Sequence, residues 1–220
     1  MEILRILISE LPQFAKGTLV ALEVLAGLLI VGLVLGLAIA LAEIFGNTLI
    51  KFLATTLRKF LWAIPQLVLL FLVFYLPFDL NRMLAAIIAL GLCSSAFQSQ
   101  IFRGAILSIQ SGQLEAAKAM GLSKPKIIFY IVIPQMIRLS IGPWTNEFSS
   151  ELKDTSLAYV VGVVEIMRNA KYIIAYTYGN TAAVYLFVGI LYFTLTRIGT
   201  SFFYRLEERL WVPGFEKRSG

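Results

Sequence analysis

The chain has 220 residues, of which 59% are hydrophobic and 15% are charged. Soluble domains average about 45–50% apolar and about 25% charged residues, so this composition excludes an ordinary soluble domain and indicates an integral membrane protein. The net charge of +6 comes with no histidine and one cysteine, which excludes an internal disulfide and argues against a zinc, haem or other cofactor centre.

Five segments are apolar enough to cross a membrane, since a spanning helix needs about 20 mostly apolar residues. The first contains an uncharged run from Val24 to Ala42. The third and fourth carry serine, glutamine and glutamate, which is typical of helices that face protein or a water-filled path. We predict an all-α, five-span protein of the cell membrane, forming a single domain over residues 1–220. The expected spans are about 18–42, 60–78, 84–102, 126–150 and 182–204.

Lysine and arginine residues predict the orientation, because cytoplasmic loops carry an excess of them. With the N-terminus outside, 13 of the 19 lie on inner segments and 5 on outer ones, while Lys153 lies in the membrane region. The inner loops are then about 43–59 and 103–125, and the outer loops about 78–83 and 157–181. We therefore predict an outer N-terminus and an inner C-terminus. The positive charge follows from this topology and indicates no nucleic-acid partner.

Uncharged polar side chains occur along the second and third spans. They are Gln66, Ser94, Ser95, Gln98 and Ser99. Such groups often serve helix–helix packing, and together they are also consistent with a polar lumen, so both interpretations stay open. Pro65 predicts a local break in the second span, because proline has no backbone N–H.

The inner loop after the third span contains a short polar helix. The segment Gln113–Met120 consists of strong helix formers, and Gly121 can end the helix because glycine adopts the left-handed conformation without steric cost. We predict this helix at about 112–122. Its Leu114, Ala117 and Gly121 share one stripe, a small-residue face suited to a groove on a partner. The alternative is a solvated connector whose helix packs on its own bundle.

The fourth span carries charged residues, which are costly inside a membrane. Glu147, Glu151 and Asp154 are four and three residues apart, so they share one helical face. Lys153 points elsewhere on an unbroken helix and turns towards a carboxylate only if the backbone breaks near 149–155. These residues line an aqueous path, form a structural ion network or lie at the outer surface.

Two further features concern the outer loop and catalysis. We expect a short helix around Val164–Tyr172 along the outer face. The sequence has no Gly-x-x-x-x-Gly-Lys-Ser/Thr motif, so we expect no ATP hydrolysis by this chain. A carboxylate-based hydrolase is a further alternative, although no histidine or cysteine supplies a nucleophile–base pair.

Two long motifs resemble the membrane subunits of ABC importers. Glu115-Ala-Ala, Gly121 and Ile133-Pro134 are similar to the EAA loop, the coupling helix that sits in a cleft of the ATPase subunit. The stretches 112–123 and 146–157 resemble the polar amino acid subfamily, the permeases for glutamine, arginine, histidine and similar substrates. The resemblance covers about residues 17–210, and two such motifs at this separation are more specific than an EAA triplet alone.

The resemblance implies a permease subunit that translocates polar amino acids as part of a dimer with an identical or different second permease. It implies two ATPase subunits, which hydrolyse the ATP, and an extracytoplasmic solute-binding protein. The implied ATPase contacts are Glu115, Ala116, Ala117 and Gly121. The resemblance implies a substrate path partway across the bilayer along the fourth-span residues Asn146, Glu147, Glu151, Lys153 and Asp154, and we add to it the polar residues Gln66, Gln98 and Ser99 of the second and third spans.

Two positions depart from the subfamily pattern. Trp62 stands where an arginine is usual, and Gln100 stands where a glutamate is usual. The joint change fits the loss of an ion pair between the second and third spans, and it leaves open a heterodimer in which this subunit binds no substrate. An ABC permease for another small polar solute and a non-ABC channel or scaffold subunit are further alternatives.

Overall fold

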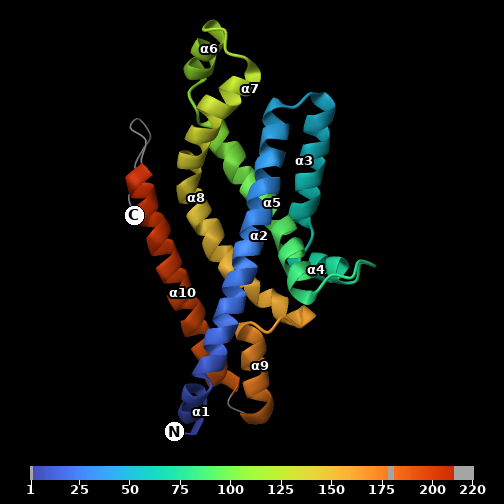
Figure 1. Ribbon diagram of the computed structural model, residues 1–220, viewed down its shortest axis with the longest axis vertical. Coiled ribbons are helices and arrows are strands. Elements are labelled where there is room, and N and C mark those ends of the chain that lie inside the picture. Colours follow the sequence, from blue (N-terminus) through green and yellow to red (C-terminus); the bar gives the residue numbers. More distant parts are fainter. Residues whose placement is uncertain (1, 178–180, 211–220) are drawn as a thin grey trace.

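The computed structural model describes residues 2–177 and 181–210, and every regular element within these ranges is helical (Figure 1). Long helices pack side by side, and shorter ones cover the two ends of the bundle. In chain order the elements are α1 (Glu2–Ser9), α2 (Leu11–Phe45), α3 (Thr48–Ala63), α4 (Gln66–Phe74), α5 (Arg82–Leu107), α6 (Ser111–Ala119), α7 (Lys124–Ile127), the π-helical turn η1 (Ile128–Val132), α8 (Ile133–Asp154), the 3-10 helix η2 (Thr155–Val161), α9 (Ile166–Thr177) and α10 (Thr181–Leu210).

Four helical rods in the described part of the chain are long and apolar enough to cross a membrane. They are α2, α5, the run Lys124–Val161 and α10. The pair α3 and α4 passes the same test when its two helices count as one broken span. The predicted all-α membrane class is therefore confirmed, and the described residues provide four spans, or five with the broken pair.

The second expected span differs in its extent and shape. The sequence predicted a loop at about 43–59 and a span at about 60–78, but α3 already begins at Thr48. Its start is capped by Asn47, whose Oδ1 accepts a hydrogen bond from the backbone N–H of Ile50 at 2.9 Å. Pro65 holds the preceding Ile64 in an extended conformation with ψ of 131°, so α3 stops and α4 leaves at a bend of 101°.

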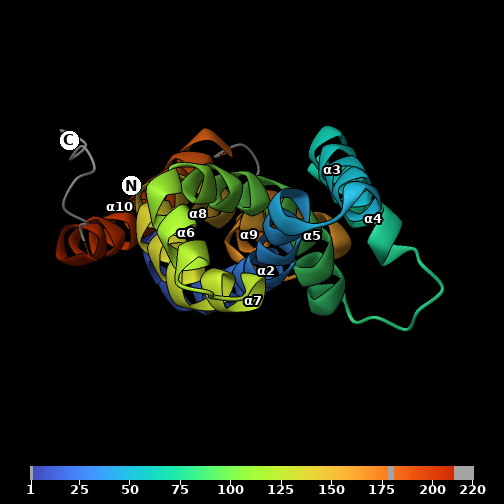
Figure 2. The same cartoon turned by 90° about the horizontal axis from the view of Figure 1, so that it is seen from above.

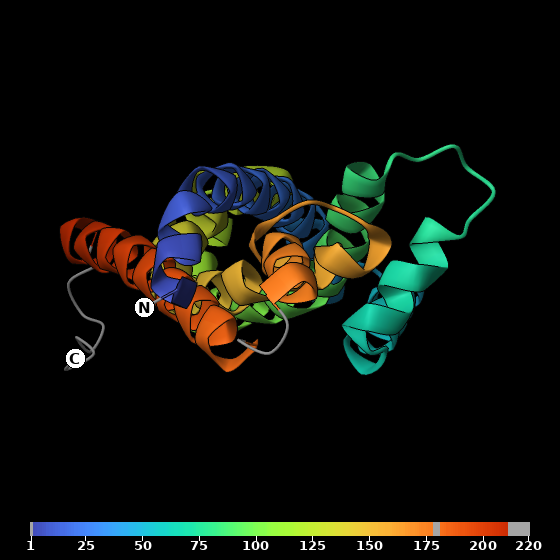
Figure 3. The same ribbon diagram turned by 90° about the horizontal axis from the view of Figure 1, so that it is seen from below.

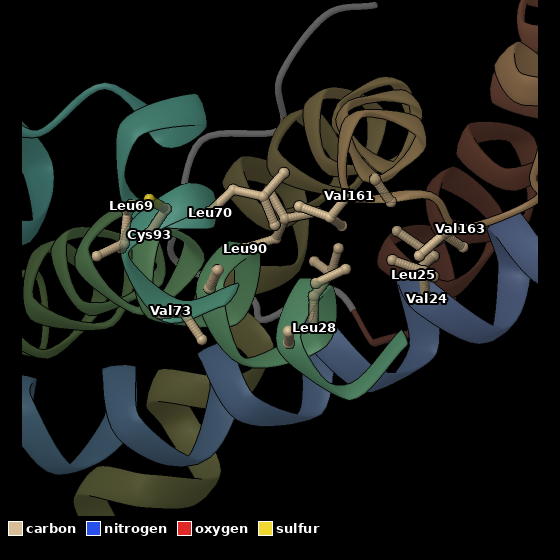
Figure 4. Packing of buried hydrophobic residues seen from close by; sticks show 14 of the residues in the cluster. Val24, Leu25, Leu28, Leu69, Leu70, Val73, Leu90, Cys93, Val161 and Val163 are labelled. Atoms are coloured by element: carbon tan, nitrogen blue, oxygen red, sulfur yellow. The ribbon is translucent and has the colours of Figure 1, made fainter. Parts of the chain in front are cut away.

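Helix α2 packs most closely along α5, through small residues. A Cβ atom at Gly32 would lie 2.4 Å from Nε2 of Gln98, and one at Gly91 would lie 2.6 Å from Cβ of Val31. The two backbones therefore approach too closely for larger side chains, as is common between membrane helices. The largest apolar cluster lies beside this contact and joins α2, α4 and α5 to the segment after α8 (Figure 4).

The fourth span is one continuous rod made of α7, η1, α8 and η2. It is longer than the expected 126–150, and α8 continues through Pro143 to Asp154. The α-helix shows no break within 149–154; it tightens into the 3-10 helix η2 only at Thr155. Consequently the three carboxylates of this span stay on one helical face, as predicted for an unbroken helix.

The short helices gather at the two ends of the bundle. At one end, α6 and α7 lie beside the turn between α2 and α3, and they cover the bundle when it is seen from above (Figure 2). At the other end, α1 and α9 lie near the start of α10 (Figure 3). The helix predicted at 112–122 is α6, with Gly121 at a φ of 78°, and the helix predicted at 164–172 is α9.

Candidate functional site

The acidic face of α8 lies against α4 and α5. Glu151 is only 1% exposed, and its carboxyl group lies close to Glu147 and to Ser94 of α5. Asp154, one turn further on, accepts a hydrogen bond from Nε2 of Gln66 at 3.1 Å. Three carboxylates from one helix therefore meet polar groups of two neighbouring helices, and we call Gln66, Ser94, Glu147, Glu151 and Asp154 the acidic cluster.

One oxygen of the acidic cluster is left without a hydrogen bond. Oε2 of Glu151 is buried and has no partner among the described residues. Buried polar atoms are normally satisfied, so an orphaned carboxylate oxygen beside two further carboxylates favours the approach of a positively charged group. Chemically, the acidic cluster can hold an ammonium group, whose positive charge would reduce the repulsion among the three acidic side chains.

Gln98 connects the acidic cluster to the centre of the bundle. It is fully buried; its Nε2 donates to Oγ of Ser94 at 3.0 Å and lies 3.4 Å from the carbonyl oxygen of Leu29. Its Oε1 accepts a hydrogen bond from Nε1 of Trp144 at 3.0 Å. The side chain of Gln98 is thereby fixed by α2, α5 and α8. Trp144 was missed by the sequence analysis, although its position one turn before Glu147 places it on the same side of α8.

The remaining residues of the expected path lie elsewhere. The hydroxyl of Ser99 donates to the carbonyl oxygen of Ala96 at 2.8 Å within α5, so it serves the helix itself. Asn146 and Lys153 are exposed on α8, away from the buried acidic face. Of the eight residues expected along the path, the structure brings together Gln66, Glu147, Glu151 and Asp154, with Gln98 joined through Ser94.

Helix α6 has one buried and one exposed face. Ala117 is fully buried in an apolar cluster with residues of α5 and α7, and Leu114 packs partly against the same cluster. Glu115 and Ala116 are exposed, and Met120, directly after α6, is 72% exposed. The stripe of Leu114 and Ala117 therefore faces the bundle, and the opposite face is open to a partner.

The end of α6 is fixed by local backbone bonds. The N–H of Gly121 donates to the carbonyl oxygen of Lys118 at 2.9 Å, and the N–H of Leu122 donates to that of Ala117 at 3.1 Å. This pattern requires a left-handed residue, which Gly121 supplies with its φ of 78°. In addition, Nε2 of Gln135 on α8 donates to Oε1 of Gln113 at 2.7 Å. The helix is thus held in a defined orientation on the bundle.

A buried carboxylate at the opposite end was not identified from the sequence. Glu165, between the fourth rod and α9, is fully buried and accepts the backbone N–H groups of Met167 at 2.7 Å and Arg168 at 2.8 Å. The hydroxyl of Tyr192 on α10 also donates to Glu165, at 3.0 Å. Burial raises the pKa of Glu165 to about 7, against the opposing effect of these hydrogen bonds. An acidic residue just before an amphipathic helix was the available signal for this capping role.

Metal chemistry finds no support in the described residues, which contain no group of three histidine, cysteine, aspartate or glutamate side chains suited to a metal ion. Cys93, the single cysteine, is buried at 1% exposure within α5. The site chemistry therefore consists of carboxylates, amides and hydroxyls between helices.

Comparison with known proteins relates this arrangement to a transport family. Residues 32–212 match the family described as "Binding-protein-dependent transport system inner membrane component". The chain is 34% identical over 214 residues to the glutamine transport system permease protein GlnP of Escherichia coli K12, covering 93% of this chain and 94% of GlnP. It is 33% identical over 185 residues to the L-cystine transport system permease protein TcyB of Bacillus subtilis, covering 82% and 79%.

A solved structure agrees with these relatives. The crystal structure of an amino acid ABC transporter with histidines contains a chain that superposes with a TM-score of 0.83 at 27% identity, covering 92% of this chain and 96% of that one. The fold, the matched family and the relatives therefore agree. The chain belongs to the family of inner-membrane permease components of binding-protein-dependent transport systems, and it lies among the amino acid ABC transporter permeases.

Proposed function

We propose that this chain is the membrane subunit of an ABC importer that translocates polar amino acids across the cell membrane. Two ATPase subunits dock at the exposed face of α6 and supply the energy, because the chain itself lacks a phosphate-binding loop motif. An extracytoplasmic solute-binding protein delivers the substrate to the opposite end. A second permease subunit completes the path, since one bundle of this size does not enclose a polar channel.

The observation that carries this proposal is the two-faced placement of α6. A polar helix held to the bundle by Ala117 and capped by Gly121, yet open along Glu115 and Ala116, has the form of a docking element. Its surroundings support the orientation inferred from charge. The end that bears α6 also bears the α2–α3 turn with Lys51 close by in sequence, and lysine-rich loops favour the cytoplasmic side (Figure 1).

Transport follows from coupling this docking element to two states of the dimer. ATP binding closes the ATPase pair, moves the two α6 helices and biases the equilibrium between inward-facing and outward-facing bundles. The shift is limited by the difference in ATP binding energy between the two states.

The acidic cluster is the proposed contact for the substrate ammonium group. Glu147, Glu151 and Asp154 bring three acidic side chains together, and their neighbours Gln66 and Ser94 supply no positive charge to balance them. An α-ammonium group, or a second positive charge on a substrate side chain, would relieve this imbalance. Among polar amino acids we therefore expect those with basic side chains to be preferred.

The proposal is tested with the importer complex, purified with its ATPase subunits and solute-binding protein and reconstituted in liposomes. ATP hydrolysis is measured while the common amino acids are screened one by one. We expect stimulation by a few polar amino acids, with the strongest responses among basic ones. Intact basal ATP hydrolysis without a response to any amino acid would contradict the substrate class. Ion conduction by the chain alone, without any ATPase, would favour a channel.

A further inference from the structure

The C-terminal end of α2 holds a buried ion cluster that connects three helices. The side chain of Glu43 is only 4% exposed. Its Oε1 accepts a hydrogen bond from Nε of Arg58 on α3 at 2.7 Å, and its Oε2 lies 3.4 Å from Nε of Arg103 on α5. Each carboxylate oxygen thus faces a different helix, so Glu43 bridges α3 and α5.

The same end of α2 also contacts α7. The Nζ atom of Lys124 donates a hydrogen bond to the backbone carbonyl oxygen of Phe45 and lies 5.8 Å from the centre of the Phe45 ring. Arg103 lies in α5, which leads into the loop that carries α6, and Lys124 is the first residue of α7, which follows that loop. The end of α2 therefore contacts both flanks of the α6 loop.

The turn after α2 is short and tightly packed. A Cβ atom at Gly46 would lie 2.4 Å from the carbonyl oxygen of Ala42, so any residue larger than glycine would force the backbone of this turn to move. Asn47 caps α3 immediately afterwards. The end of α2 and the start of α3 are consequently held close together, and α3 is additionally tied to Glu43 through Arg58.

We propose that Glu43 is a positioning residue that couples movement of α6 to the α2–α3 hairpin. This inference rests on the proposed docking of an ATPase at α6 and names the path by which its movement reaches the spans. A carboxylate between two guanidinium groups attracts both helices to α2. Removing its charge leaves Arg58 and Arg103 facing each other without compensation, so the α6 loop can move while the hairpin stays behind.

The test is Glu43→Gln in the complete importer complex, with Glu23→Gln on an exposed part of the same helix as the matched control. The measured quantity is the number of ATP molecules hydrolysed per amino acid transported. For Glu43→Gln we expect this number to rise about tenfold, while the ATPase subunits still co-purify and the melting temperature stays close to wild type. Glu43→Asp, which keeps the charge, should restore most of the coupling.

The possible results separate this inference from the proposed function. If the wild-type chain binds no ATPase subunit, the proposed function fails, whatever Glu43 does. If the wild-type complex is coupled and folded Glu43→Gln keeps the wild-type ATP-to-substrate ratio, the inference is overturned. A parallel loss of transport and ATP hydrolysis would likewise indicate a structural role only. Should Glu43→Gln fail to fold, Arg103→Gln replaces it in the test. Arg103 is 49% exposed, so this variant should fold, and the same rise in the ATP-to-substrate ratio is expected.

Discussion

Helix α6 and the acidic cluster place charged side chains in opposite surroundings. On α6, Glu115 and Lys118 are exposed to solvent, where a charge costs little and a substitution seldom disturbs the fold. In the acidic cluster, Glu151 is buried beside two further carboxylates, and one of its oxygens lacks a partner among the described residues. The difference underlies our proposal that the first region docks a protein partner and that the second holds a small positive group.

The largest effect is expected from charge reversal on α6. Glu115→Arg should abolish co-purification of the ATPase subunits and lower transport by about 100-fold, because an interface charge then meets its complementary surface with the wrong sign. The fold should be unaffected, since the side chain is exposed. Asp79→Arg, an exposed acid between α4 and α5, is the matched control and should keep the complex intact. Equal losses in both variants would refute a specific docking face.

A somewhat smaller effect is expected in the acidic cluster. Glu151→Gln keeps the shape of the side chain and replaces its acidic group with an amide, so transport should fall by about tenfold through a higher KM. The ATPase subunits should still co-purify, in contrast to Glu115→Arg. Glu23→Gln on α2 serves as the control for loss of a carboxylate in a span. An unchanged KM in Glu151→Gln would assign the acidic cluster a structural role.

Packing between α2 and α5 provides a test beside the acidic cluster, because Gly32 lies against Gln98 and Ser94. Gly32→Ala places a methyl group against Nε2 of Gln98 and should lower stability by about 1 kcal/mol or more. Gly189→Ala on α10 is the control, because the described residues leave open space around its Cβ position. The comparison is made from thermal unfolding of the purified chain in detergent. Equal melting temperatures for Gly32→Ala and Gly189→Ala would show that α2 and α5 are less closely packed at Gly32 than the 2.4 Å approach indicates.

The last prediction concerns pH and Glu165. Its pKa is raised from 4.5 to about 7, so the folded state binds this proton more tightly than the unfolded state. The stabilisation is complete below pH 4.5 and is lost as the pH rises through 7, with a slope of at most about 1.4 kcal/mol per pH unit. Glu165→Gln should remove this part of the pH dependence in unfolding experiments. If unfolding of Glu165→Gln depends on pH as the wild type does, Glu165 is not the group responsible.

Much of the fold could be predicted from periodicity and hydropathy. The uncharged run in α2 and the helix formers with Gly121 in α6 are local signals, and local structure follows them. The early start of α3 depended on the cap by Asn47, a short-range signal that the apolar window concealed. The spacing of Glu147, Glu151 and Asp154 predicted their common face correctly.

Other features depended on contacts between distant segments. Ala117 was predicted on a face suited to a partner's groove, yet it is buried against its own bundle, because its neighbours from α5 and α7 are set by tertiary packing. The link from Trp144 to Gln98 joins residues on different spans, and so does the link from Glu43 to Arg58. A single sequence contains no pairing information of this kind.

Thiol cross-linking of α6 to the ATPase subunit tests the central claim most directly. Met120→Cys is the probe position, because Met120 is 72% exposed, whereas the native Cys93 is buried and should not react. In the purified complex, we expect a cross-linked product from Met120→Cys and none from Ala117→Cys or Asp79→Cys. An intact, ATP-hydrolysing complex that cross-links through Asp79→Cys and not through Met120→Cys would contradict it.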